Sequence, residues 1–313
     1  MRPRAKRRNK RFSIHIIIAL IIIPLIGCIY FAVQYRNLDA YIARHVEMLA
    51  ISEHEICEYS GHYICECDYD YEPEVYEEII QNMIVPIPYQ LMHPHLFIEN
   101  DFQYVDAPRG TIYLTFDDGP TWMTERILNI LRDRDVPATF FVIYQRGEFA
   151  ERMYRRIVDE GHALAHHSAS HNYRQIYHSM EAFLDDFAKL SDMLYEVTGV
   201  RPEVFRFPGG SNTGHLRRIQ QEAIAELLRR GYVYFDWEVT SASTSPEATA
   251  NTMYRAIVNG SRGRDRTIVL MHDSGNAGII TALPGIIDTL RARGYTFAVL
   301  DRTVRPVYFN YFH

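Results

Sequence analysis

The sequence is short of positive charge over a long internal stretch. Between Arg44 and Arg109 there is no Lys or Arg, whereas 14 Asp and Glu residues occur there. Basic residues gather instead near the N-terminus, at Arg2, Arg4, Lys6, Arg7, Arg8, Lys10 and Arg11. The formal net charge of -6 therefore hides a basic end followed by an acidic segment. This distribution argues against an extended basic surface for nucleic acid.

Cysteine is also scarce. The four cysteines are Cys28, Cys57, Cys65 and Cys67. They are too few for a scaffold of several disulfides, although the last three could form one local disulfide with one thiol left over. The segment "HEICEYSGHYICEC" would alternatively let His54 and His62 join these cysteines around a metal ion. Its spacing matches no familiar zinc module, so the disulfide is favoured.

Residues 12–33 form one long apolar run, interrupted only by Ser13 and His15. Its 22 residues are enough to cross a bilayer as a single helix. Because the basic residues precede the run, the N-terminus should stay cytoplasmic and the remainder should lie outside. We expect residues 1–11 to be a cytoplasmic tail and residues 12–34 to be a transmembrane anchor in the cell membrane.

Two other interpretations of this run remain open. A cleaved secretory signal would release the protein, but no Ala-x-Ala site follows the run. A lipoprotein would be anchored at Cys28, since "LIGC" resembles a lipobox. However, "IYFAV" continues the apolar run beyond Cys28, where a lipoprotein normally becomes polar. The uncleaved anchor is therefore favoured.

The chain between the anchor and residue 107 carries no long periodic pattern. It contains an acidic, Tyr-rich part, "CDYDYEPEVYEE", and a Pro-punctuated part, "IVPIPYQLMHPH". We interpret residues 35–107 as an extracytoplasmic stalk or small N-terminal region, most simply a solvated spacer. A single large domain, residues 108–313, is expected to follow.

From residue 111 onward, short apolar runs alternate with helical patterns. Seven runs predict strands: residues 111–115, 138–143, 162–166, 203–207, 232–237, 267–271 and 295–300. The clearest helical stripe is formed by Phe183, Phe187, Leu190 and Leu194. Glycines at expected helix ends are Gly161, Gly199, Gly231 and Gly294. This alternation predicts an α/β fold with a parallel sheet, either open or closed into a barrel.

Ionisable residues follow the predicted strands, and in parallel β/α folds the carboxyl ends of the strands carry the active site. In chain order these residues are Asp117 and Asp118, His166 to His171 in "HHSASH", Arg206 before "FPGG", and His272 with Asp273. Trp237 lies in the fifth run. Any one of them alone has an ordinary structural explanation, such as a turn, a surface ion pair or a buried histidine. Their joint placement at strand ends favours a catalytic site.

The motifs "TFDDGP", "HSASH", "RFPGG" and "LMHD", in this order, resemble those of the polysaccharide deacetylase family, carbohydrate esterase family four with its NodB-type homology domain. The resemblance covers about residues 108–302. It implies a distorted (β/α)7 barrel and the metal-dependent removal of acetyl groups from N-acetylated glycans.

The residue types fit that chemistry. Asp118, His167 and His171 would supply one oxygen and two nitrogens to a divalent metal, most simply zinc, although cobalt or another divalent ion also suits this set. The two histidines are four positions apart, so one helical turn or a tight loop could bring both rings to one side. His166 stands where the family usually has an amide, and we expect it to be structural.

The remaining motif residues take roles around this metal set. Asp117 would be the general base and His272 would protonate the departing amine. Arg206 would orient Asp117. The resemblance also implies that Gly209 supplies a backbone N–H to the oxyanion, and that Trp237 and Leu270 lie beside the substrate. Gly209 stands where many relatives carry an aromatic residue, so the groove is expected to be more open there.

One family motif departs from the usual pattern. The stretch "FDWEVTSASTS" has Thr240 and Ser243 where acids are expected to orient and charge the catalytic histidine. Asp236 or Glu238 could substitute, but strand alternation would turn Asp236 and Trp237 to opposite faces. The sequence therefore predicts a weaker or differently tuned acid.

The leading hypothesis is a membrane-anchored deacetylase of peptidoglycan N-acetylglucosamine that uses no nucleotide cofactor. Alternative substrates are poly-N-acetylglucosamine, chitin fragments or acetylated xylan. A weakly catalytic glycan-binding relative is a second possibility, supported only by Thr240 and Ser243. An assembly or signalling role through residues 35–107 is a third, supported by the acidic bias and the Cys-His cluster.

Overall fold

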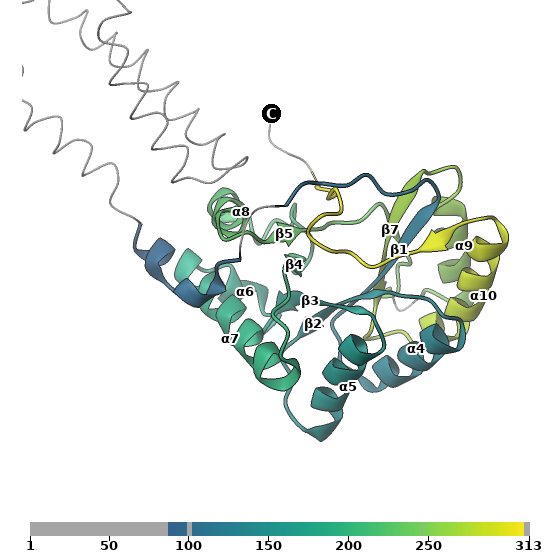
Figure 1. Cartoon of the computed structure of the whole chain (residues 1–313), viewed down its shortest axis with the longest axis horizontal. Coiled ribbons are helices and arrows are strands. Elements are labelled where there is room, and N and C mark those ends of the chain that lie inside the picture. The colour runs from purple at the N-terminus through teal and green to yellow at the C-terminus, as the bar shows by residue number, and fades with distance from the viewer. Residues whose placement is uncertain (1–86, 99–101, 246, 310–313) are drawn as a thin grey trace, which may run out of the picture. The chain divides into compact units, whose positions relative to one another are not determined.

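The computed structural model describes residues 87–98, 102–245 and 247–309. The described chain falls within one compact unit that spans Pro86–His313. A curled sheet occupies its middle, and Figure 1 shows helices α4, α5, α7, α9 and α10 placed around the outside of that sheet. These helices are α4 Trp122–Asp133, α5 Glu148–Asp159, α7 Met180–Thr198, α9 Ala250–Gly260 and α10 Gly278–Ala292.

All strand pairs in the described sheet are parallel. The strands are β1 Thr111–Asp117, β2 Thr139–Ile143, β3 Ala163–Ser168, β4 Val204–Phe205, β5 Val233–Tyr234, β6 Val239–Thr240, β7 Arg266–His272 and β8 Thr296–Phe297. Their order is β5-β4-β3-β2-β1-β7-β6, with β8 paired to the start of β1. Because β1 pairs with β7 in a register that sets Asp117 opposite His272, two predicted catalytic residues lie side by side.

The prediction of a parallel sheet with alternating helices is confirmed, and the curled sheet is consistent with a (β/α)7 barrel. The edge strands β5 and β6 are joined by residues 235–238 alone. Strand β6 was not among the seven predicted runs. Residues 235–238 are not part of a strand, so strand alternation does not govern where Asp236 and Trp237 point.

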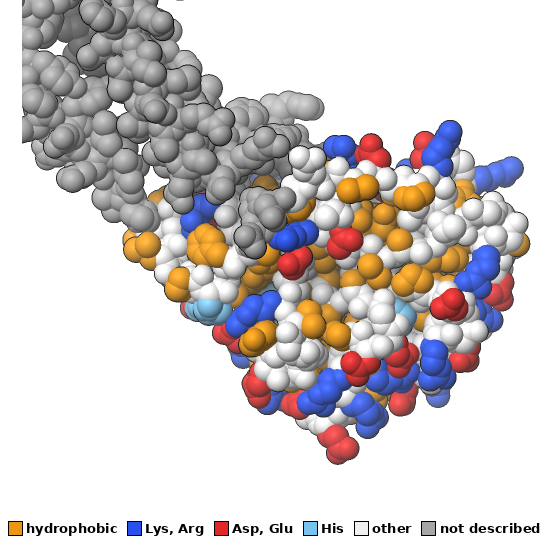
Figure 2. Space-filling view, viewed as in Figure 1, with side chains coloured by type: hydrophobic (Ala, Val, Ile, Leu, Met, Phe, Trp, Pro, Cys, Tyr) orange, Lys and Arg blue, Asp and Glu red, His pale blue; other side chains and the backbone are white. Residues whose placement is uncertain are grey.

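The core lies between the sheet and its helices. All four residues of the predicted apolar stripe, Phe183, Phe187, Leu190 and Leu194, are buried on α7. Helix α5 shows the same division, since Ala150, Met153, Tyr154 and Ile157 face inward. Charged side chains crowd the outer surface where α4 and α5 lie (Figure 2). This pattern is that of helices with one apolar face against a sheet.

Residues 87–98, which were predicted to belong to the stalk, pack against the helices of this unit. Two short 3-10 helices, η1 Pro88–Leu91 and η2 Pro94–Leu96, lie beside α7 and α8 (Gln220–Arg229), and Leu96 is fully buried. Arg230 is also fully buried, and its guanidinium donates to the carbonyls of Met92 at 2.8 Å and His93 at 2.9 Å. Glu226 accepts from Arg230 Nε at 2.6 Å. We call Glu226 and Arg230 the α8 clamp.

Gly231 allows residues 87–98 to approach the end of α8 closely. Gly231 has a φ of 89°, and a Cβ there would lie 2.6 Å from the carbonyl oxygen of Ile98. Only a residue without a side chain allows this approach.

The predicted cytoplasmic tail, the anchor and the Cys-His cluster of residues 54–67 lie outside the described residues. Within the described residues no helix is both long enough and apolar enough to span a membrane.

We predict that Arg230→Met lowers the free energy of unfolding by about 3–5 kcal/mol, because it removes one partner of a buried ion pair and leaves carbonyls unpaired. Denaturant unfolding of the full-length protein measures this. Arg132→Met is the control: Arg132, near the end of α4, is exposed and pairs with the exposed Asp133, so about 1 kcal/mol or less should be lost. Equal losses in the two variants would contradict the assigned role of the α8 clamp.

Candidate active site

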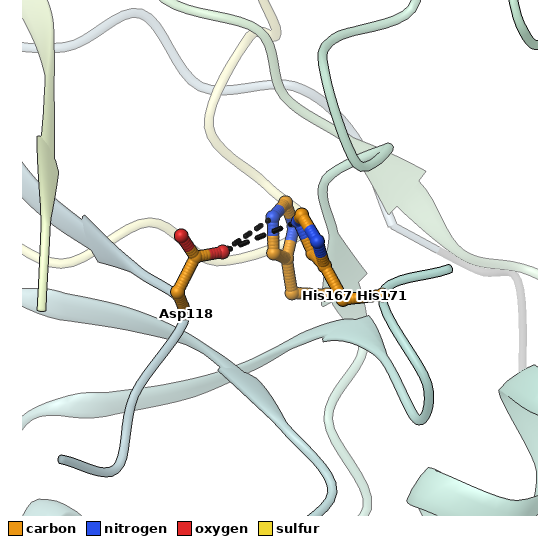
Figure 3. Close-up of side chains that lie close together, drawn as sticks. All are labelled: Asp118, His167 and His171. Carbon is orange, nitrogen blue, oxygen red and sulfur yellow. Dashed lines mark ion pairs between the residues drawn. The ribbon is translucent and has the colours of Figure 1, made fainter. Parts of the chain in front are cut away.

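Three side chains converge at the carboxyl end of the sheet. Asp118 follows β1, His167 lies in β3, and His171 follows β3 in the next loop. Figure 3 shows the three side chains pointing toward one another. Asp118 Oδ1 lies 3.5 Å from His167 Nε2 and 3.3 Å from His171 Nε2. One ligand atom from each residue falls within 4.8 Å of the other two, a spacing compatible with a shared metal ion.

The backbone turns these side chains toward a common point. Asp118 has a φ of 74° and His171 a φ of 49°, both in the left-handed region that few residues other than glycine adopt. Such conformations persist where surrounding contacts hold them, and they cluster at functional sites.

The donor set fits a divalent metal. Asp118 Oδ1 is buried and has no hydrogen-bond partner among the described residues, although two imidazole nitrogens face it. His167 Nδ1 lies 2.9 Å from the carbonyl oxygen of Arg206, which requires a proton on Nδ1 and leaves the Nε2 lone pair directed at Asp118. Metal-binding histidines are commonly oriented by such a bond on the other ring nitrogen. One oxygen and two nitrogens suit zinc and related ions.

The charges around Asp118 keep its carboxylate ionised. Burial by itself would raise the pKa of Asp118, but the facing imidazoles of His167 and His171, with a smaller contribution from His272, lower it well below its ordinary value. Burial would lower the pKa of His167, yet Asp117 and Asp118 outweigh burial and raise it. The pKa of His171 is instead lowered, first by burial and then by His167. The cluster therefore combines a negative oxygen with two imidazole nitrogens that could bind a cation.

Asp117 stands beside this cluster without joining it. Its Oδ2 is 3.8 Å from His167 Nε2, and its Oδ1 accepts from Arg206 Nη1 at 2.7 Å. Arg206 is fully buried, and its Nη1 also donates to Thr115 Oγ1 at 2.7 Å, while its Nε donates to the carbonyl of Phe235 at 2.9 Å. The predicted contact between Arg206 and Asp117 is present, and it fixes the orientation of that carboxylate.

His272 lies across from Asp117, and its partner is a serine. Ser243 Oγ lies 3.0 Å from His272 Nδ1 and accepts the backbone N–H of His272 at 3.1 Å. Burial lowers the pKa of His272, against the opposing effect of Asp117 and Asp118. The side chain that touches the histidine ring at Nδ1 is therefore Ser243, the position where the sequence departs from the family pattern.

Neither acid considered as a substitute contacts His272. Asp236 is fully buried and accepts from Ser211 N at 2.9 Å and from Phe309 N at 2.8 Å. Glu238 instead accepts the backbone N–H of Ile268. Thr240 is exposed, and its hydroxyl accepts from Ala242 N. Asp236 thus joins the loop after β4 to the C-terminal segment.

The predicted substrate-side residues lie around the same edge. Trp237 packs edge-on against Phe309, with ring centroids 4.7 Å apart, and Leu270 is nearly buried in β7. Gly209 has a φ of 80°. The space beside it is not open: a Cβ on Gly209 would lie 3.2 Å from both the Tyr173 hydroxyl and Thr213 Oγ1.

Asp186, on α7, is a residue that sequence reasoning missed. Its carboxylate accepts from Ser168 Oγ at 2.8 Å, Ala169 N at 2.7 Å and Ser170 N at 2.8 Å. Ser168 Oγ in turn accepts the backbone N–H of His171 at 2.8 Å. Asp186 therefore shapes the loop that presents His171. From the sequence alone, the loop after His167 is expected to need acceptors for its backbone N–H groups. No spacing in the sequence indicates which acid supplies them.

Together these features define a hydrolase-like site on a barrel-like α/β fold, with a candidate metal cluster, a separate carboxylate and a histidine. The family model described as polysaccharide deacetylase matches residues 104–227. The putative polysaccharide deacetylase YheN of Bacillus subtilis is 34% identical over 202 residues, which cover 63% of this chain and 70% of that protein. A peptidoglycan-N-acetylglucosamine deacetylase of Bacillus cereus is 28% identical over 212 residues, covering 66% of this chain and 74% of that protein.

A solved structure agrees. The catalytic domain of peptidoglycan N-acetylglucosamine deacetylase from Eubacterium rectale superposes with a TM-score of 0.64 at 32% identity, covering 66% of this chain and 96% of that chain. The chain belongs to the polysaccharide deacetylase family, carbohydrate esterase family four, and is a hydrolase that acts on N-acetyl amide bonds.

We predict that Asp186→Asn weakens zinc binding by about 10- to 100-fold, because residues that orient metal-binding side chains have effects of this size. Competition with a chromophoric chelator measures the dissociation constant on the full-length protein. Asp185→Asn is the control, since Asp185 is the neighbouring acid on α7, is largely exposed and pairs with His93. An unchanged zinc affinity in Asp186→Asn would contradict this role.

Proposed function

We propose that this protein is a metal-dependent N-deacetylase of a cell-wall polysaccharide, most specifically of peptidoglycan N-acetylglucosamine. The observation that carries the proposal is the cluster of Asp118, His167 and His171 with Asp117 held beside it by Arg206. Amide hydrolysis by an activated water requires a base that is not itself a metal ligand, and Asp117 is placed to be that base.

The nucleophilic half of the reaction falls to Asp117. A divalent cation bound by Asp118, His167 and His171 would polarise the acetyl carbonyl and lower the pKa of the attacking water. Asp117 takes the proton of that water as the O–C bond forms. Arg206 keeps the carboxylate turned toward the water, since two of its guanidinium nitrogens are fixed by other buried groups.

The leaving-group half falls to His272. It gives a proton to the sugar nitrogen as the C–N bond breaks, which releases acetate and leaves a free amine. Gly209 supports the tetrahedral intermediate between the two halves, because its N–H makes no hydrogen bond within the described residues and is available to an oxyanion.

The proposed substrate is supported by the relatives, whereas the proposed location is supported by the N-terminal sequence. Relatives named peptidoglycan-N-acetylglucosamine deacetylases favour that glycan over chitin-type or poly-N-acetylglucosamine substrates. The apolar run of residues 12–33, preceded by seven basic residues, supports a single-pass anchor that holds the enzyme outside the cytoplasm. Anchoring at Cys28 or secretion would place the site in the same compartment.

A second candidate function is glycan binding with weak catalysis. The contact between Ser243 and His272 favours it, because a hydroxyl cannot stabilise an imidazolium as a carboxylate does. The two candidates differ in turnover and share the same site.

We predict that zinc-loaded, full-length protein releases acetate from peptidoglycan fragments faster than from chitopentaose or poly-N-acetylglucosamine, and that a chelator stops the reaction. Asp117→Asn is the matched variant. It should bind zinc as the wild type does, yet release acetate about 10²- to 10⁴-fold more slowly, since it lacks the base. Mass spectrometry of the glycans follows the acetyl loss. No acetate from any of the three glycans would refute the deacetylase.

We predict that Ser243→Asp raises the turnover number. A carboxylate beside Nδ1 would raise the pKa of His272, so a larger share of the histidine carries the proton it must donate. A group whose pKa rises stays protonated to higher pH, so the alkaline limb of the rate profile should also move upward. Thr240→Asp, at an exposed position, is the control. An unchanged turnover number and pH profile in Ser243→Asp would show that proton donation by His272 does not limit the rate.

A further inference from the structure

Tyr173 lies at the side of the candidate site, next to His171 and Gly209. It is the first residue of α6 (Tyr173–Ile176) and follows the candidate ligand His171 by two positions. The two rings lie 5.4 Å apart. On its other side the hydroxyl lies 3.2 Å from the position of a Gly209 Cβ. The tyrosine ring therefore lies beside a candidate metal ligand, and its hydroxyl lies beside Gly209.

This hydroxyl makes no hydrogen bond to any residue that the structure describes, although the tyrosine is half-buried. The ring is held by its neighbours, with the centroid of His215 at 5.0 Å and that of Tyr177 at 6.1 Å. A phenol that is fixed in place but bonds nothing is a ready donor for a ligand.

Tyr177 shows the contrast within the same segment of chain. It is buried, and its hydroxyl donates to the carbonyl of Pro208 at 2.9 Å. That bond fastens α6 to the loop containing Gly209. Tyr177 therefore has a structural use for its hydroxyl, whereas Tyr173, one helical turn earlier, has none in the described protein.

Two neighbouring residues therefore each carry a donor without a hydrogen bond among the described residues, Gly209 at its N–H and Tyr173 at its O–H. We propose that Tyr173 is a substrate-binding residue: its hydroxyl donates a hydrogen bond to an oxygen of the N-acetylated sugar lying over Gly209, and its ring forms the wall of that subsite. The proposal rests on the proposed function, because it concerns the glycan that the site would bind.

The surface of a sugar offers groups that can bind both the hydroxyl and the ring of Tyr173. N-acetylated sugars carry hydroxyl and acetamido oxygens that accept hydrogen bonds, together with apolar C–H groups that pack on aromatic rings. A rigid tyrosine offers both contacts with only two side-chain torsions to fix. The contact is made in the bound substrate as well as in the transition state, so its loss should raise KM more than it lowers kcat.

The test compares three Tyr→Phe variants of the zinc-loaded, full-length protein with chitopentaose as substrate. Tyr173→Phe should raise KM by about 2- to 12-fold, the range for one neutral hydrogen bond, with kcat within about twofold and with zinc affinity and thermal stability unchanged. Tyr177→Phe should lower the melting temperature, because it removes a buried hydrogen bond. Tyr195→Phe, on the exposed surface of α7, should change neither.

A KM for Tyr173→Phe within twofold of the wild type, or a loss confined to kcat, overturns the inference. A lowered melting temperature or weakened zinc binding in Tyr173→Phe also overturns it, since the hydroxyl would then be structural. If the wild type releases no acetate, the proposed function fails, and calorimetric titration with chitopentaose decides the inference separately. Weaker binding by Tyr173→Phe than by the wild type supports it, whereas equal binding, or no binding by either protein, overturns it.

Discussion

The buried ion pair between Arg206 and Asp117 is the interaction on which the site depends. Arg206 is fully buried, and its guanidinium joins β1, through Thr115 and Asp117, to the chain that follows β5, through Phe235. A charge buried this deeply is tolerated only when it is paired and hydrogen-bonded. The same contacts that make the arginine acceptable in the core also set the direction of the Asp117 carboxylate, so packing and catalytic geometry have one cause.

The sequence alone was sufficient for the parallel alternating fold and for the strand ends that carry the site, because both follow from short-range patterns. The placement of Asp117, Asp118, His167 and Arg206 is of this kind. Asp186 and Tyr173 were missed because their roles arise from tertiary contacts between a helix and a loop. The interpretation of Asp236 relied on strand alternation, which residues 235–238 do not follow because the chain there crosses between the two edges of the sheet.

The two halves of the proposed reaction differ in how strongly their catalytic side chains are stabilised by charged neighbours. On the water-activating side, the Asp117 carboxylate is paired with the buried Arg206 guanidinium, and the Asp118 carboxylate faces two imidazoles. On the leaving-group side, the histidine meets only a hydroxyl at Nδ1. Low dielectric magnifies such differences, because a neutral neighbour does little to stabilise a buried cation. Substrates whose amine leaves easily would be affected least by this imbalance.

The hydrogen bond between Asp236 and the backbone of Phe309 has a consequence for how the enzyme is made. The carboxylate that holds Ser211, beside the oxyanion loop, also holds a residue 73 positions further along the chain. During synthesis, and during any passage across a membrane, the candidate metal ligands emerge long before Phe309. The loop that contains Ser211 therefore gains this contact only after Phe309 has been delivered, so a chain delivered only as far as the candidate metal ligands would still lack it.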